Sequence, residues 1–66
     1  MKIIVNGENR EFKEDITLQE VLEILNLEGK VMAAAVNMNI VKQDLWKEYT
    51  LKEDDKLELL DFVGGG

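Results

Sequence analysis

One stretch of the sequence, residues 17–25, has the period of an amphipathic helix, and β-forming runs lie on both sides of it. Its first four residues have the form of a capping box, Thr17-Leu18-Gln19-Glu20. Apolar residues then recur at three- and four-residue spacing, at Leu18, Val21, Leu22 and Leu25. Gly29 is expected to break the chain soon after the helix, as a cap or in a turn. A lone helix with one apolar face needs a sheet to cover it, so we expect an α+β fold.

A β-hairpin is predicted before the helix. Residues 2–6 are rich in β-branched side chains and predict a strand, and Asn6-Gly7 is a strong turn signal because both residues tolerate a positive φ. We expect the returning strand at residues 10–13. By the alternation of a strand, Ile3 and Val5 face the core and Ile4 faces the opposite side.

A third strand is predicted at residues 31–36. This run is apolar throughout, and its three alanines suit a helix by propensity but also suit a strand crossed closely by a helix. The turn at 37–39 and the β-type run at 40–42 favour the strand.

The remaining chain has no clean period until its last strand. Residues 43–52 predict a short helical turn and irregular chain, with Trp46 and Leu51 directed inward; Trp46 as a surface anchor is the alternative. A turn at Asp54-Asp55 precedes a strand at 56–62. The resulting order is that of a β-grasp domain, with a mixed sheet of four to five strands packed on one main helix.

The residue types that are missing exclude several classes of function. The 66 residues include no His, Cys or Pro, and the sequence has no Ser. A serine or cysteine triad is therefore impossible, and no imidazole is available for acid-base catalysis near neutral pH. The acidic run at residues 53–55 lacks the alternation and the glycine of a calcium loop. We expect no metal, no bound cofactor and no enzymatic activity of the chain alone.

The net charge of −6 disfavours nucleic acid as a partner. Basic residues are scattered singly, so they form no basic stripe. No segment approaches the length of a signal peptide's apolar core or of a membrane span. We expect a cytoplasmic protein, monomeric on its own, that binds proteins with basic surfaces.

The sequence closes with Gly64-Gly65-Gly66. Glycine loses the most conformational entropy on ordering, so these residues do not stabilise the fold. A tail without Cβ atoms can instead enter a narrow channel, and residues 63–66 span roughly 13 to 14 Å when extended. We therefore divide the chain into a β-grasp domain, 1–62, and a flexible tail, 63–66. A frayed end or an engineered linker is the alternative.

Exposed apolar residues are expected beside this tail. If Glu58 faces water, Leu57 and Leu59 face the helix and Leu60 and Phe62 face solvent with Glu58. Together with Ile4 and Val63, Leu60 and Phe62 are expected to form a patch that docks a partner. Alternatively, the strand is irregular and these residues cover an edge of the core.

Several of these segments together carry a resemblance to a known family. They are Ile3-Ile4-Val5-Asn6, Leu18 to Leu22, Ala35-Val36-Asn37 followed by Ile40-Val41, Trp46, and Asp54 to Leu60 leading to Phe62-Val63-Gly-Gly-Gly. Over essentially its full length the chain resembles ThiS, within the ThiS and MoaD group of ubiquitin-like sulfur carriers.

The resemblance implies a function in thiamine biosynthesis. In such proteins a ThiF-like adenylyltransferase uses ATP to adenylate the terminal glycine. Sulfur relayed from cysteine by a cysteine desulfurase then makes a thiocarboxylate, and a ThiG-like thiazole synthase uses it to build the thiazole ring. Carried over, Gly66 bears the sulfur, Gly65 threads the enzyme channel beside it, and Gly64 extends the minimal diglycine pattern.

Other functions share the same body and tail. MoaD-like carriers for molybdopterin usually have longer chains, so length favours ThiS. Carriers for tRNA thiolation are not separated by any residue of this sequence. A ubiquitin-like modifier or binding module, and a scaffold without activity, are the alternatives from other classes.

Overall fold

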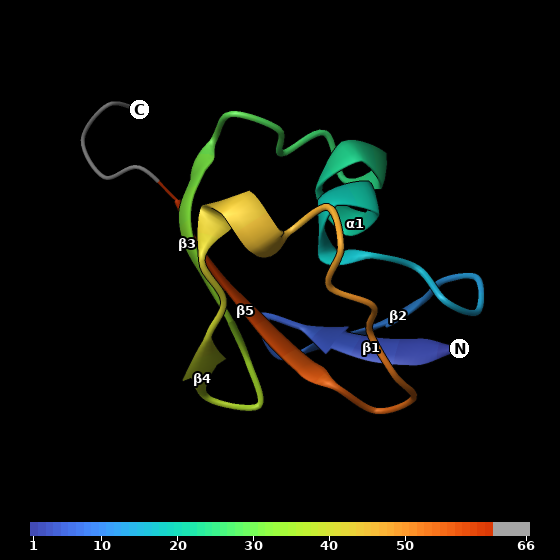
Figure 1. Ribbon diagram of the computed structural model, residues 1–66. Coiled ribbons are helices and arrows are strands. Elements are labelled where there is room, and N and C mark those ends of the chain that lie inside the picture. The colour runs from blue at the N-terminus through green and yellow to red at the C-terminus, as the bar shows by residue number, and fades with distance from the viewer. Residues whose placement is uncertain (62–66) are drawn as a thin grey trace.

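The computed structural model describes residues 1–61, and the predictions made for residues 62–66 lie outside the described residues. The elements, in chain order, are β1 (Lys2–Val5), β2 (Glu8–Glu11), α1 (Leu18–Ile24), β3 (Val31–Val36), β4 (Asn39–Ile40), the 3-10 helix η1 (Gln43–Leu45) and β5 (Lys56–Asp61). The strands form one sheet of order β2-β1-β5-β3-β4, shown in Figure 1. The central strand β5 runs parallel to β1 and antiparallel to β3. This is the mixed-sheet, ubiquitin-like β-grasp arrangement that the sequence predicts.

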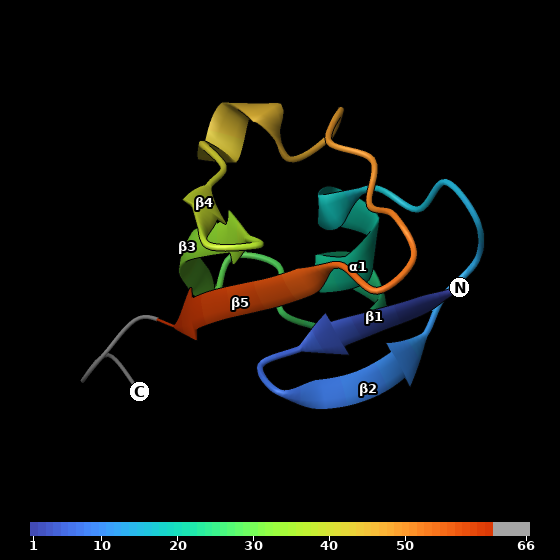
Figure 2. The same ribbon diagram turned by 90° about the horizontal axis from the view of Figure 1, so that it is seen from below.

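The core lies between α1 and one face of the sheet. Figure 2 shows α1 and the segment carrying η1 on the same side of the sheet. The predicted alternation of β1 is confirmed, because Ile3 and Val5 are buried and Ile4 is only half-buried. Trp46 and Leu51 are also buried, as predicted, and the Trp46 indole N–H donates to the Val41 carbonyl oxygen at 2.8 Å. A buried indole that keeps a hydrogen bond fills the core without leaving an unpaired donor.

The two ends of α1 are closed by different residues. At the start, the predicted capping box is present: the Glu20 backbone N–H donates to Thr17 Oγ1 at 3.2 Å, and the Thr17 N–H donates to Glu20 Oε1 at 3.0 Å. At the end, Asn26 has a φ of 60°, and the Leu27 N–H donates to the Leu22 carbonyl oxygen at 2.8 Å. This left-handed cap is made by Asn26, so Gly29, with a φ of 72°, belongs to the turn that follows.

The returning strand of the first hairpin begins earlier than predicted. The prediction of residues 10–13 is wrong at its start, because β2 spans Glu8–Glu11. Asn6 and Gly7, with φ of 48° and 84°, form a two-residue turn that pairs Val5 directly with Glu8. A two-residue turn leaves no spacer between the strands, so pairing resumes immediately after Gly7.

The alanine-rich strand is confirmed as β3. Ala34 faces the core with 1% of its surface exposed, so a small side chain lies where the sheet meets the elements packed above it. A second two-residue turn, Asn37-Met38 with φ of 50° and 72°, leads to the short strand β4. Within residues 1–61, neither helical segment is long and apolar enough to cross a membrane.

Candidate functional site

The strand that leads to the glycine tail is the central strand of the sheet. β5 is hydrogen-bonded to β1 on one side and to β3 on the other, and Asp61 still pairs with Val31. A strand with partners on both sides has less freedom to fray than an edge strand. The tail therefore begins at the most firmly held strand of the domain.

Two asparagines, each in one of the two-residue turns, also bind the backbone of β5. The Leu59 N–H donates to Asn6 Oδ1 at 2.7 Å, and Asn6 Nδ2 donates to the Leu59 carbonyl oxygen at 3.4 Å. At the opposite end of β5, the Lys56 N–H donates to Asn37 Oδ1 at 3.0 Å. Both asparagines have a positive φ, which this residue type adopts more readily than most. The hairpin turns thus hold β5 near both of its ends.

A shallow hollow of about 310 Å³, which we call the outer hollow, lies on the face of the sheet opposite α1. Its lining comes from β3, β4, β5 and the first turn. The residues are Asn6, Ala33, Ala35, Ile40, Glu58, Leu59 and Leu60. Ile40 is 72% exposed and Leu60 is 54% exposed. Exposed side chains of this size, grouped over small alanines, make a concave apolar surface suited to a protein partner.

The predicted docking residues fall in different places. Leu60 lies in the outer hollow, on the same side of β5 as Glu58, while Leu57 and Leu59 are buried as predicted. Ile4 is on the same face but pairs with Lys56, four residues before Leu60, which is roughly 13 Å along the strand. The structure therefore does not bring Ile4 beside Leu60. Phe62, Val63 and the three glycines lie outside the described residues.

Sequence reasoning missed three residues of the outer hollow, Ala33, Ala35 and Ile40. Ala33 pairs with Leu60, and Ala35 pairs with both Glu58 and Ile40 across its two neighbouring strands. The alternation of β3 places Ala33 and Ala35 opposite the buried Ala34. The signal was present in that alternation, but the partners of each strand follow only from the sheet order.

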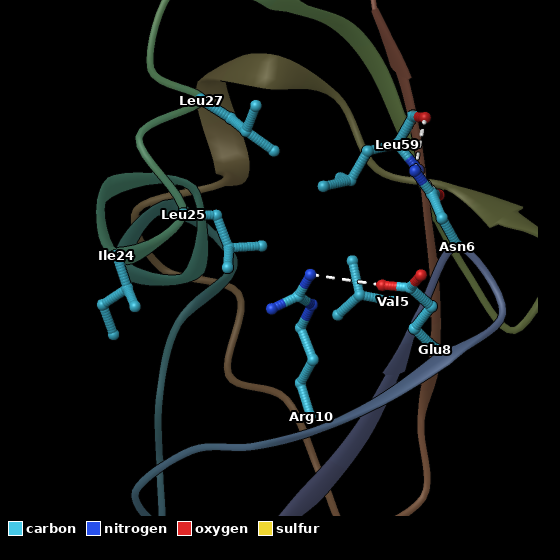
Figure 3. Close-up of a pocket in the computed structure, with 8 residues that line it drawn as sticks. All are labelled: Val5, Asn6, Glu8, Arg10, Ile24, Leu25, Leu27 and Leu59. Atoms are coloured by element: carbon cyan, nitrogen blue, oxygen red, sulfur yellow. Dashed lines mark hydrogen bonds and ion pairs between the residues drawn. The ribbon is translucent and has the colours of Figure 1, made fainter.

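A second hollow, of about 450 Å³, lies on the helix side between β2 and the end of α1. Figure 3 shows the Arg10 side chain reaching between Leu25 and Val5. The Arg10 guanidinium donates to Glu8 Oε1 at 3.2 Å, so the only cation drawn in this hollow is already paired. This helix-side hollow is partly filled by its own charged pair, whereas the outer hollow is open to a partner.

The titratable groups point to structural roles. The pKa of Glu20 is held below its ordinary value, first by the hydrogen bond from the Thr17 backbone N–H and then by the Lys13 side chain. Lys13 Nζ lies 3.2 Å from Glu20 Oε2. In the part of the chain that the structure describes, no three acidic residues gather as a metal site. Glu20 thus closes the helix start and is remote from the tail-bearing strand.

Comparison with known proteins identifies the family. The sequence profile described as the ThiS family matches residues 3–66. The sulfur carrier protein ThiS of Bacillus subtilis is 33% identical over 63 residues, which are 94% of this chain and 96% of that protein.

A longer relative and a solved structure add to this comparison. A thiazole synthase of Paramagnetospirillum magneticum is 33% identical over 66 residues, and this chain spans only 20% of its length. The crystal structure of a thiamine biosynthesis protein (ThiS) from Geobacter metallireducens superposes with a TM-score of 0.83 over the whole of both chains, at 27% identity. On the profile match, the fold and these relatives, the chain belongs to the ThiS family.

Proposed function

We propose that this chain is a sulfur carrier of thiamine biosynthesis that acts through the carboxylate of Gly66. The observation that carries the proposal is the arrangement around β5: a strand held on both sides, with an exposed apolar hollow beside it, leads directly into a triple-glycine sequence. The folded body serves as a handle for partners, and the chemistry takes place at the tail.

The chemistry needs activation because a carboxylate is a poor electrophile. The Gly66 carboxylate oxygen attacks the α-phosphorus of ATP on a ThiF-like adenylyltransferase, which forms an acyl-adenylate and releases pyrophosphate. Hydrosulfide, or an equivalent sulfur nucleophile supplied from cysteine by a desulfurase, then attacks the acyl carbon. AMP leaves with the bonding electron pair, and the product is a thiocarboxylate. The chain is therefore the substrate of these steps and supplies no catalytic group of its own.

The body contributes binding energy at a distance from the reacting atom. Contacts over the outer hollow fix the position of β5 on the partner, and this restricts where Gly66 is placed. Gly64 and Gly65 lack side chains that would collide with the walls of a narrow channel. The steps draw on ATP as the partner's co-substrate, and we place them in the cytoplasm.

Thiazole synthase is the proposed acceptor of the sulfur. Support comes from the relative in Paramagnetospirillum magneticum, named thiazole synthase, because the segment similar to this chain lies within that longer polypeptide. A carrier and an acceptor joined in one chain meet at high effective concentration. The thiocarboxylate sulfur is a nucleophile suited to transfer into a ring under construction.

Isotope exchange between ATP and pyrophosphate tests the activation step. With the cognate adenylyltransferase, the wild-type chain is expected to support exchange, because adenylation is reversible. A variant with one alanine added after Gly66 is the matched control, since it keeps the body and moves the carboxylate. Equal exchange with both chains, or none with the wild type on an enzyme that is active with its own carrier, contradicts the proposal.

A further inference from the structure

Glu58 is a carboxylate set among the apolar residues of the outer hollow. It is exposed and lies on β5 between Leu57 and Leu59, which point to the core. Ala35 is directly opposite it on β3, and Ile40 lies beyond Ala35 on β4. The lining of the hollow thus combines a charge with the apolar surface of its neighbours.

The charge of Glu58 has no cation to balance it within residues 1–61. None of the salt bridges of these residues involves Glu58. Lys56 shares its face of β5, two residues away, yet forms no salt bridge with it. Ala35 carries only a methyl group, so no long side chain of β3 covers the carboxylate at its paired position.

Docking on the outer hollow removes water from Glu58. A carboxylate that is buried without a partner costs more free energy than the neighbouring apolar contacts return. An arginine or lysine placed against it avoids that cost and adds a charge-assisted hydrogen bond. A surface without such a cation is rejected, which is how a single charge selects between partners.

We propose that Glu58 determines which protein docks on the outer hollow, and that this partner is the adenylating enzyme. Its docking surface presents an apolar side chain to Leu60 and Ile40 and a guanidinium or ammonium group to Glu58. The net charge of −6 acts in the same direction, because it attracts a basic surface over a longer range. This inference rests on the proposed function, since it names the partner of the same site.

The test measures the dissociation constant between the full chain and the adenylating enzyme, without ATP, at low and high salt. Glu58→Gln is expected to weaken binding about 30-fold, because it removes one partner of a buried charge pair. Glu58→Lys is expected to weaken binding further by placing two cations together. Glu48→Gln is the matched control, since it removes the same charge two residues after Trp46, on the helix side. It is expected to bind within about twofold of wild type.

The salt dependence separates a charge contact from a loss of shape. Wild-type binding is expected to weaken more with salt than Glu58→Gln binding does. Thermal unfolding of each variant checks that the exposed substitutions leave the fold intact. Wild-type affinity of both Glu58 variants overturns the inference, and so does a loss of affinity confined to thiazole synthase.

The outcome is distinguishable from failure of the proposed function. If the Glu58 variants bind normally and Gly66 still acquires sulfur, this inference is wrong and the carrier function stands. If the wild-type chain never acquires sulfur, the function itself fails.

Discussion

The side-chain amide of Asn6 binds both backbone polar groups of Leu59. The Leu59 N–H donates to Asn6 Oδ1 at 2.7 Å, and Asn6 Nδ2 donates to the Leu59 carbonyl oxygen at 3.4 Å. The last backbone pair of the parallel β1 and β5 ladder joins Val5 and Leu57. The Asn6 side chain therefore continues this ladder for two residues after β1 has turned away.

Replacing Asn6 by glycine tests this contact. Asn6→Gly keeps the positive φ of the turn and removes the amide, so the free energy of unfolding is expected to fall by about 1 to 2 kcal/mol. Hydrogen exchange of the Leu59 amide is expected to accelerate. Asn37→Gly is the matched control, because it makes the same change at the other turn and frees the Lys56 amide instead. Equal acceleration of both amides in both variants contradicts the account.

The capping box predicts a specific dependence on pH. Because the folded-state pKa of Glu20 is lowered, its contribution to stability is complete above the ordinary glutamate pKa and is lost as pH falls through the lowered value. The stability difference between wild type and Glu20→Gln is therefore expected to shrink on acidification. Urea unfolding across a pH series measures it. Glu23→Gln is the control in the same helix, and an identical pH profile of the two variants argues against the cap.

Met38 is a bulky residue in a left-handed conformation, with a φ of 72°. Met38→Gly is expected to raise the free energy of unfolding by about 0.5 to 1 kcal/mol, since relief of about 1 to 2 kcal/mol exceeds the entropy cost of glycine. Gly7→Ala is the reverse change in the other turn, where no atom lies within 4 Å of an added Cβ. It is expected to destabilise the protein. Chemical unfolding of both variants decides, and a destabilised Met38→Gly refutes the strain.

The exposed leucine of the outer hollow has a matched counterpart on the other side. Leu60 is 54% exposed and Ile24, at the end of α1, is 58% exposed. If the adenylating enzyme docks on the outer hollow, Leu60→Asp is expected to weaken its binding at least about tenfold, while Ile24→Asp has little effect. Titration calorimetry with both variants measures this. Equal losses at both positions show that the docking surface is elsewhere.

Local chemistry explains why much of the fold was predictable. The turn at Asn6-Gly7, the capping box at Thr17 and the alternation of β5 each depend on residues within a few positions of one another. The alanine-rich run was ambiguous by propensity, and the turn after it decided correctly for a strand. The start of β2 was placed too late because the two-residue turn leaves no gap before pairing resumes.

The parts that were missed depend on contacts between distant segments. Asn6 and Leu59 are 53 residues apart in sequence, and no local pattern indicates that one side chain binds the other's backbone. The outer hollow likewise needs the register of β3 against both β4 and β5. Leu60 was placed on the correct face by alternation, but Ile40 and the alanines beside it follow only from the sheet order.

Intact-mass spectrometry tests the central claim, that Gly66 carries sulfur, most directly. The full chain is incubated with ATP, the cognate adenylating enzyme and a sulfide source, beside a variant lacking Gly66. The account predicts a mass change that matches replacement of one oxygen by sulfur, localised to the terminal residue and absent from the variant. An unchanged mass, with an enzyme shown to thiolate its own carrier, contradicts the account.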